Sequence, residues 1–322
     1  MKILLADKFP SFGVDLLKAS GHVCVSKPDL SDSDLPAEVA DTEILVVRST
    51  KVTQKTIESA PKLQMIIRAG AGTNTIDKSE ANLRKIPVCN VPGRNAVAVA
   101  ELVMGLIISI DRRIPDNVVE LREGRWNKKR FSASQGIYGK SLGVIGVGAI
   151  GLAVLERARG FGLRMLVIEK SSRPDNIQKR LSEIGVEAVS DIESLINESH
   201  ILTFHLPANS STKRMIDGSF LEKVKHDTVI INTSRGDLID EQALIRALNE
   251  KNLKVGLDVY DNEPSTSVGE FNSELAKHPN VYGTHHIGAS TAQAQRAVAE
   301  GVIEIVEEFT NGQLLNCVNM PS

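Results

Sequence analysis

The sequence predicts an α/β fold in which two parallel sheets are each covered by helices on both faces. Short β-branched runs alternate with helical patterns along the whole chain, which is typical of βαβ units. These runs fall into two series separated by a long apolar segment. The length of 322 residues is enough for two globular domains. We therefore expect two doubly wound domains.

The first series contains five expected strands, enough for one small sheet. They lie at residues 2–6, 23–26, 44–48, 65–69 and 88–91. The second series contains six expected strands and predicts a larger sheet. They lie at residues 141–147, 164–169, 201–206, 228–233, 256–259 and 281–284.

Two helical segments border the second series. Residues 95–110 are apolar on nearly every helical face, so this helix should be buried between domains or between subunits and should open the second domain. Residues 297–310 have apolar side chains at helical spacing and end before Asn311 and Gly312, which predict a left-handed cap. We expect this last helix to return to the first domain and no regulatory module to follow it.

Charge and cysteine content exclude several classes of protein. The 38 basic and 40 acidic residues leave a net charge of −2, which argues against general electrostatic binding to nucleic acid or to an anionic membrane. Cys24, Cys89 and Cys317 show no C-x-x-C spacing and predict neither a disulfide framework nor a thiolate zinc site. With neither a signal peptide nor a spanning helix expected, the sequence favours a soluble cytoplasmic protein.

A glycine-rich motif follows the first strand of the second series. Gly146, Gly148 and Gly151 form G-x-G-x-x-G between an apolar run and the helical residues 152–159. The glycines allow a tight turn and a close approach to a pyrophosphate, while the helix N-terminus supplies N–H groups and a partial positive charge. A tight turn without a ligand is the alternative.

The next expected strand ends in an acid, as a dinucleotide site requires. Glu169 lies 169 − 151 = 18 positions after Gly151, where its carboxylate would accept hydrogen bonds from a ribose and repel a 2′-phosphate. NAD is therefore favoured over NADP. The following residues 170–173 (KSSR) leave NADP open, because a cation and hydroxyl groups could receive the phosphate.

Three ionisable residues follow strands of the second series, at the sheet edge where such folds bind ligands. They are Arg235, Glu263 and His286. Oxidising an alcohol beside a carboxylate needs a cation, a base and an acid that orients the base, and these three side chains supply those functions. Each could instead serve structure alone, in a surface ion pair, a Glu-Pro turn or a capped loop.

At these residues the chain resembles the D-isomer-specific 2-hydroxy acid dehydrogenases. The likeness rests on INTSRGDLIDEQAL at 231–244, GLDVYDNEP at 256–264 and HIGAST at 286–291. The resemblance implies that Arg235 binds the substrate's carboxylate and carbonyl, that His286 is the acid/base and that Glu263 pairs with it. It also implies that Asp258 holds the nicotinamide carboxamide.

The resemblance further implies how the domains are arranged. Residues 1–95 and 288–322 would form a discontinuous, flavodoxin-like substrate-binding domain, and residues 96–287 an inserted Rossmann NAD-binding domain, with substrate in the cleft between them. Relatives carry a proline where His285 stands. Adjacent residues of an extended segment point to opposite sides, so only one histidine can face the nicotinamide, and we choose His286. The same geometry makes a metal site at this pair improbable.

Within the family the likeness is greatest to the branch that oxidises 3-phosphoglycerate. It rests on residues 46–53 (VVRSTKVT), 68–77 (RAGAGTNTID), 95–102 and 124–131 (GRWNKKRF). The expected substrate contacts, besides Arg235, are Arg48, Ser49, Ala71, Gly72, Asn95, Lys128, Lys129 and Arg130. Of these, Ala71 and Gly72 belong to a glycine-rich turn whose N–H groups could bind a carboxylate. A simple turn is the alternative.

The basic stretch at 128–130 also bears on assembly. In the resemblance it comes from the neighbouring subunit and reaches the phosphate, so we expect a homodimer or homotetramer. Trp126 would suit a buried anchor at that contact. A solvated charged face is the alternative. The expected cofactor contacts are Gly146, Gly148, Ala149, Ile150, Gly151, Glu169, His205, Pro207, Thr212, Thr233 and Asp258.

These residues together predict NAD-dependent oxidation of (R)-3-phosphoglycerate to 3-phosphohydroxypyruvate, the first step of serine biosynthesis in that branch. A glyoxylate or hydroxypyruvate reductase, or another D-2-hydroxy acid dehydrogenase, would use the same chemistry without the phosphate contacts. An NAD-sensing corepressor is an alternative of another class, because such relatives can retain Arg235, Glu263 and His286. The partner expected in the enzyme case is a small phosphorylated hydroxy acid.

Overall fold

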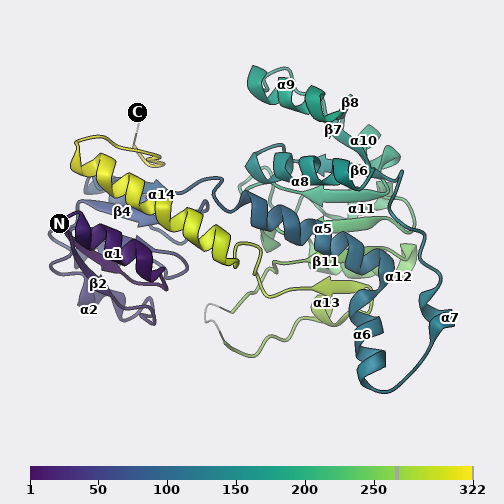
Figure 1. Cartoon of the computed structure of the whole chain (residues 1–322), viewed down its shortest axis with the longest axis horizontal. Coiled ribbons are helices and arrows are strands. Elements are labelled where there is room, and N and C mark those ends of the chain that lie inside the picture. The colour runs from purple at the N-terminus through teal and green to yellow at the C-terminus, as the bar shows by residue number, and fades with distance from the viewer. Residues whose placement is uncertain (265–267, 321–322) are drawn as a thin grey trace. The chain divides into compact units, whose positions relative to one another are not determined.

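A computed structural model describes residues 1–264 and 268–320 of the chain (Figure 1). It divides into two compact units. The smaller unit comprises Met1–Asn95 and Ala289–Ser322, and the larger comprises Ala96–Gly288. The larger unit thus ends at Gly288, one residue beyond the expected boundary at 287. That the smaller unit binds substrate stays a prediction.

The smaller unit contains one five-stranded parallel sheet. Its strands are β1 (Lys2–Leu5), β2 (Val23–Ser26), β3 (Ile44–Val47), β4 (Met65–Arg68) and β5 (Val88–Asn90). Their order is β2-β1-β3-β4-β5, which is the flavodoxin-like order with its reversal between β1 and β3. In the register of this sheet, Ile3 is paired with Cys24 and Ile44.

Helices cover this sheet on both faces. They are α1 (Ser11–Ala19), α2 (Leu35–Glu38), α3 (Gln54–Glu58), α4 (Lys78–Leu83) and α14 (Ala292–Thr310). The α14 helix packs beside α1, as Figure 1 also shows. Its apolar stripe, which includes Val302 and Val306, lies in one core with Ile3, Ile67 and Cys89 of the strands. This packing returns the C-terminal segment to the first domain, as predicted from the sequence.

The larger unit contains a seven-stranded parallel sheet. Its strands are β6 (Ser141–Ile145), β7 (Arg164–Ile168), β8 (Glu187–Val189), β9 (Ile201–Phe204), β10 (Val229–Asn232), β11 (Lys254–Leu257) and β12 (Val281–Gly283). The order is β12-β11-β10-β9-β6-β7-β8. Read from β8, this is the Rossmann order with one further strand, and the direction of winding reverses between β6 and β9.

Two layers of helices enclose the larger sheet. The helical elements are α5 (Ala96–Arg112), α6 (Ile114–Arg122), α7 (Lys128–Phe131), α8 (Ala149–Gly160), α9 (Asp175–Ile184), α10 (Ile192–Glu198), α11 (Gly218–Lys223), η1 (Gly236–Leu238), α12 (Glu241–Lys251) and α13 (Glu274–Lys277). Figure 1 shows α5 beside α8, and the two share one core cluster. The opposite cluster is filled from α10, α11 and α12.

The predicted fold class is confirmed, with corrections to its elements. The larger sheet has seven strands rather than six, because β8 was not predicted. The helix expected at 95–110 spans Ala96–Arg112, and part of its buried side packs against α8 and the sheet of its own unit. Burial of this helix between domains or between subunits stays a prediction. The helices expected at 152–159 and 297–310 begin earlier, at Ala149 and Ala292. The predicted cap is confirmed by Gly312, whose φ is +82°.

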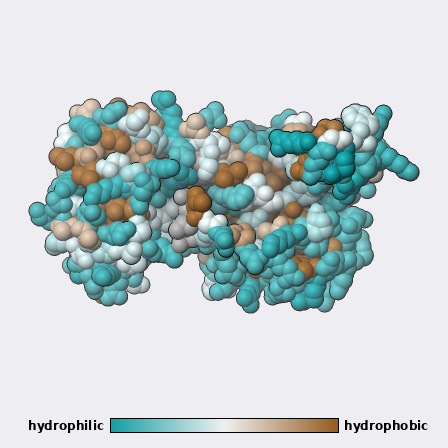
Figure 2. Space-filling model, turned by 90° about the horizontal axis from the view of Figure 1, so that it is seen from below, coloured by the Kyte–Doolittle hydropathy of each residue, from teal (hydrophilic) through white to brown (hydrophobic). Residues whose placement is uncertain are grey.

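Within the described ranges no helix is both long enough and apolar enough to cross a bilayer. The face in Figure 2 is mostly hydrophilic, with hydrophobic residues scattered among polar ones. Single exposed apolar residues are normal on folded proteins.

Candidate active site

The glycine motif forms a tight turn from β6 into α8. Gly146 has a φ of +100°, and a Cβ placed on it would lie 2.3 Å from the carbonyl oxygen of His205. A Cβ on Gly151 would lie 2.0 Å from the oxygen of Gly146. These two glycines are thus required by the packing of the turn itself.

Gly148 has a different role in the same turn. It is the N-cap of α8, and a Cβ placed on it would meet no atom within 4 Å. Its missing side chain leaves open space directly before Ala149 and Ile150, the first residues of the helix. The N–H groups at a helix N-terminus lack partners inside the helix and favour an anion. The turn therefore has the form that a pyrophosphate requires.

The expected ribose carboxylate lies at the end of the neighbouring strand. Glu169 directly follows β7 and is exposed. Arg173 belongs to the 170–173 stretch whose cation and hydroxyl groups could receive the 2′-phosphate of NADP. It donates from Nη2 to the backbone oxygen of Ile168 at 3.0 Å. That hydrogen bond ties one end of the guanidinium to the sheet.

Two buried polar atoms lie at the ends of β9 and β10. Nδ1 of His205 and Oγ1 of Thr233 have no hydrogen-bond partner among the described residues. Nε2 of His205 is 3.0 Å from Oγ1 of Thr203, and burial lowers the pKa of His205 to about 3, so the imidazole is neutral. Because buried polar atoms nearly always have partners, these two fit contacts to a bound dinucleotide beside the winding reversal.

The loop after His205 is held by its own hydrogen bonds. Thr212 donates from Oγ1 to the backbone oxygen of Pro207 at 2.6 Å and accepts from the backbone N–H of Asn209 at 2.9 Å. Both Pro207 and Thr212 were expected to contact the cofactor. The structure brings them together in one ordered turn, and their contact with cofactor stays a prediction.

The expected base and its partner are in direct contact. Nδ1 of His286 lies 2.6 Å from Oε2 of Glu263, and Oε1 of Glu263 accepts from the backbone N–H of Tyr260 at 2.8 Å. His286 has a φ of +50°, in the left-handed region, which is unusual for a residue other than glycine. The contact joins Glu263 to His286 rather than to the adjacent His285 within the described ranges.

Electrostatics keep this carboxylate ionised. Burial alone would raise the pKa of Glu263, but the hydrogen bond and charge of His286, the N–H of Tyr260 and the charge of Arg235 lower it overall. Burial lowers the pKa of the half-buried Arg235, while the carboxylates of Glu263 and Asp237 raise it. Arg235 and Glu263 are therefore near enough to interact, and the three expected catalytic residues lie in one unit.

Arg235 is positioned by the turn that follows β10. The side chain of Asn232 donates to the backbone oxygen of Arg235 at 2.8 Å and accepts from the N–H of Ser234 at 3.0 Å. Ser234 donates in turn to the backbone oxygen of Phe204 at 2.6 Å, which fastens the turn to β9. Beyond its place in the motif at 231–244, nothing in the sequence indicated this role for Asn232.

Asp258 organises the segment that carries His286. This buried residue follows β11, and its carboxylate accepts from the backbone N–H groups of Ile287 and Gly288, both at 2.8 Å. It also accepts from Oγ1 of Thr284 at 2.6 Å. Both oxygens of Asp258 thus hold the turn around His286. The contact with the nicotinamide carboxamide that the resemblance implies stays a prediction.

In the smaller unit, Arg48 and Ser49 follow β3 at its winding reversal. Asp7, which follows β1, accepts from the backbone N–H groups of Arg48, Ser49 and Thr50 at 2.6 to 3.2 Å. Those N–H groups therefore already hold a carboxylate of the protein itself. Of the two side chains, Arg48 donates from Nη2 to Oγ of Ser290 at 3.4 Å. Sequence reasoning missed Asp7, although its position directly after the first strand was the available signal.

The predicted carboxylate-binding turn follows β4. Gly70 has a φ of +142°, and its N–H donates to the backbone oxygen of Arg68 at 2.8 Å. Ala71 is exposed and Gly72 half-buried, and the backbone oxygen of Ala71 accepts from Nδ2 of Asn90 at 2.6 Å. Asn95 is half-buried directly before α5. Their contact with substrate stays a prediction.

The basic stretch lies on α7 of the larger unit. Lys128, Lys129 and Arg130 are exposed, and Arg130 forms an ion pair with Glu120. Trp126 just before them is 82% exposed on the chain itself, so it is not an anchor within one subunit. Burial of this tryptophan by a second subunit stays a prediction.

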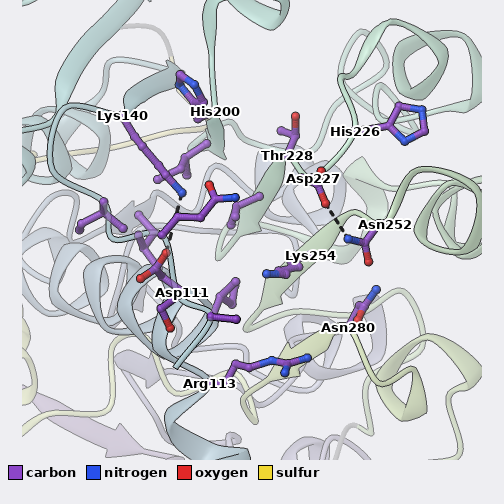
Figure 3. A pocket seen from close by; sticks show the side chains of 18 of the residues that line it. Asp111, Arg113, Lys140, His200, His226, Asp227, Thr228, Asn252, Lys254 and Asn280 are labelled. Atoms are coloured by element: carbon purple, nitrogen blue, oxygen red, sulfur yellow. Dashed lines mark hydrogen bonds and ion pairs between the residues drawn. The ribbon is translucent and has the colours of Figure 1, made fainter. Parts of the chain in front are cut away.

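A cavity of about 470 Å³ lies at the opposite edge of the larger sheet (Figure 3). Lys140, His200, Thr228 and Lys254, at or just before the starts of strands, line it, and Lys140 pairs with Asp111 there at 3.8 Å. None of the three expected catalytic residues lines this cavity. Among the described residues no cluster of His, Cys, Asp and Glu is suited to a metal ion.

The carboxyl edge of the larger sheet thus defines a class of protein, a dehydrogenase with a Rossmann unit. Comparison with known families supports this class. Residues 104–288 match the family described as "D-isomer specific 2-hydroxyacid dehydrogenase, NAD binding domain". The match covers more than half of the chain, which therefore belongs to this family, and its larger unit is the family's NAD-binding domain.

Individual relatives agree in family and differ in name. The chain is 38% identical to D-3-phosphoglycerate dehydrogenase of Methanocaldococcus jannaschii, over the whole chain but only 60% of that protein. It is 37% identical to hydroxypyruvate reductase of Thermotoga maritima, over 96% of the chain and 97% of that protein. The structure of a glyoxylate reductase from Paecilomyes thermophila aligns with a TM-score of 0.84 at 27% identity, covering 99% of this chain and 98% of that one.

Proposed function

We propose that the protein oxidises (R)-3-phosphoglycerate to 3-phosphohydroxypyruvate with NAD as the acceptor, the first step of serine biosynthesis. The observation that carries the chemistry is the 2.6 Å contact of His286 with the ionised Glu263, in the unit that also holds Arg235 and the glycine turn. The choice of substrate is supported by the likeness to the Methanocaldococcus jannaschii protein, whose name gives this activity.

The state of Glu263 determines which nitrogen of His286 acts. An ionised carboxylate only accepts hydrogen bonds, so Nδ1 of His286 carries the proton of that contact. In the neutral form of the imidazole, Nε2 then has the lone pair and takes the proton of the substrate's C2 hydroxyl. Bound NAD would supply the acceptor for the hydride that leaves C2.

Arg235 would hold the substrate in place for this step. A guanidinium matches a carboxylate with two parallel hydrogen bonds, which fixes orientation as well as position. The turn held by Asn232 and Ser234 keeps Arg235 fixed at the same sheet edge as His286. Holding C2 in a reactive geometry lowers the barrier by avoiding the entropy cost of alignment at the moment of reaction.

The phosphate would be bound by cationic and polar groups outside this trio. We propose Lys128, Lys129 and Arg130 of a neighbouring subunit together with Arg48, Ser49 and Asn95, and backbone N–H groups at Ala71 and Gly72 for the carboxylate end. This assignment requires a homodimer or homotetramer. The three cysteines, an odd number without C-x-x-C spacing, support a reducing, cytoplasmic location.

A second candidate is reduction of hydroxypyruvate or glyoxylate. It is favoured by the Thermotoga maritima relative, whose name gives the hydroxypyruvate activity and which is 37% identical over 96% of this chain. The chain spans about 60% of the Methanocaldococcus jannaschii protein. The catalytic trio would be the same. The two functions differ only in whether a phosphate is recognised.

Initial rates on paired acids separate the two functions. The assay follows reduced nicotinamide with (R)-3-phosphoglycerate or unphosphorylated D-glycerate, using either NAD or NADP. We expect a much higher kcat/KM for the phosphorylated acid, and expect changing Lys128, Lys129 and Arg130 together to alanine to remove most of that preference. Equal turnover of both acids with a silent triple variant would support the reductase instead.

A further inference from the structure

Two of the three cysteines face each other across a pair of antiparallel segments. The segment after α14 runs beside β5, and Cys89 is paired with Cys317 in this short antiparallel contact. The N–H of Asn90 donates to the oxygen of Asn316 at 3.2 Å, and the N–H of Val318 donates to the oxygen of Val88 at 2.9 Å. These bonds flank the two cysteines, which therefore form a non-hydrogen-bonded pair.

This kind of pair has the spacing of a disulfide. In non-hydrogen-bonded antiparallel pairs the Cα atoms are about 4.5 Å apart, and disulfides span about 4.4 to 6.8 Å. Both side chains lie on the face of the sheet that α14 covers, because Cys89 belongs to that core and Cys317 packs against it. The Sγ of Cys317 donates to Oδ1 of Asn319 at 3.4 Å, and Cys317 is near enough to Cys89 to contribute to raising the pKa of its thiol.

We propose that Cys89 and Cys317 are a built site of covalent modification, which a low-molecular-weight disulfide converts to an intramolecular disulfide. The thiolate of Cys317 attacks the reagent, forming a mixed disulfide and releasing one thiolate. The sulfur of Cys89 then attacks that of Cys317 and releases the second. Two protein thiols are oxidised, one reagent disulfide is reduced to two thiols, and the protons of the cysteines pass to those thiols.

Access and reactivity set the order of these steps. Cys317 is partly exposed, whereas Cys89 is fully buried, so only the former meets a reagent from solvent. Burial, together with the neighbouring Cys317, raises the pKa of Cys89 to about 12. Since the thiolate is the nucleophile, the second step is slow and the mixed disulfide on Cys317 precedes the cross-link.

The cross-link would join the two chain segments of the discontinuous smaller unit. Cys89 lies in residues 1–95 and Cys317 in the returning segment, which is otherwise held on β5 by the bonds above and by Asn319. Asn90, the last residue of β5, donates from its side chain to the backbone oxygen of Ala71, and the N–H of Val91 donates to the backbone oxygen of Gly70. The cross-link would therefore fasten the strand that supports this turn.

The test is oxidation of the whole, fully reduced protein with excess oxidised glutathione, followed by alkylation and peptide mapping without reductant. We expect free thiols to fall from three to one per chain, a cross-linked peptide pair containing residues 89 and 317, and alkylated Cys24. Cys89→Ser and Cys317→Ser should each lose the cross-link, while Cys24→Ser, the matched control, should retain it.

Thermal unfolding gives an independent readout. Oxidised wild type and oxidised Cys24→Ser should unfold about 5 °C higher than their reduced forms, and oxidised Cys89→Ser should show no such rise. A glutathione adduct that persists on Cys317 beside a free Cys89, or a disulfide that involves Cys24 or a second chain, would overturn the proposal.

Discussion

At the scale of single residues, the structure separates two adjacent histidines by their partners. His286 contacts Glu263 at 2.6 Å, whereas His285 has no such contact within the described ranges. We expect His286→Asn to lower kcat by about 10² to 10⁴, the usual contribution of a general base. His285→Asn is the matched control and should keep near wild-type rates. Steady-state kinetics in which His285→Asn is the damaging change would contradict the assignment.

A second prediction for a single residue concerns His205 and the pH dependence of the free energy of unfolding. Its pKa is about 3 in the folded protein and 6.5 in the unfolded chain, so below pH 6.5 the unfolded chain binds a proton that the folded one does not. The free energy of unfolding therefore decreases as the pH is lowered, by about 2 kcal/mol from pH 6.5 to pH 5. Urea unfolding of His205→Asn should lack this component, and parallel curves for wild type and variant would count against it.

At the scale of elements, the turn from β6 to α8 contains a glycine whose substitution should weaken NAD binding without changing stability. Because a Cβ on Gly148 meets no atom within 4 Å, Gly148→Ala should unfold at the wild-type temperature. The same methyl group occupies the space before the helix N-terminus, so we expect the Kd for NAD to rise about tenfold, equivalent to about 1.4 kcal/mol. Calorimetric titration measures this, with Gly160→Ala at the far end of α8 as control. Unchanged NAD binding by Gly148→Ala would place the dinucleotide elsewhere.

The segment after β12 depends in the same way on Asp258. Asn offers one acceptor oxygen where the carboxylate offers two, so Asp258→Asn leaves either the N–H of Ile287 or the buried N–H of Gly288 without a partner. We expect a loss of about 1 to 3 kcal/mol in unfolding free energy and a fall in kcat that exceeds any rise in substrate KM. Asp227→Asn, an exposed control, should change neither. A normal kcat in a destabilised Asp258→Asn would limit this residue to a purely structural role.

Sequence patterns predicted the buried elements better than the exposed ones. Eleven predicted runs became strands. Most of them are buried, and a parallel strand covered on both faces reads as a continuous apolar run, whereas β2 and β12 contain no fully buried residue. β8 is three residues long, and only Val189 of it is buried, so it gives no such run. The roles of Asp7 and Asn232 depend on backbone N–H groups brought close by the fold, which no spacing in the sequence encodes.

At the scale of the whole molecule, each of the two parallel sheets brings candidate site residues together where the direction of its winding reverses. The larger sheet brings the glycine turn and His205 to one reversal, and Arg235, Glu263 and His286 follow strands on one side of it. The smaller sheet brings Asp7 together with Arg48 at another. Strand order was implied by the family resemblance, whereas the hydrogen bonds at each reversal required the structure.

The central claim is that hydride leaves C2 of a D-2-hydroxy acid for NAD while His286 takes the hydroxyl proton. Turnover of (R)-3-phosphoglycerate deuterated at C2, followed by mass spectrometry of the reduced cofactor, tests it most directly. The account predicts reduced nicotinamide carrying one deuterium, formed by wild type and scarcely by His286→Asn. Reduced cofactor without deuterium, or equal rates for wild type and variant, would contradict it.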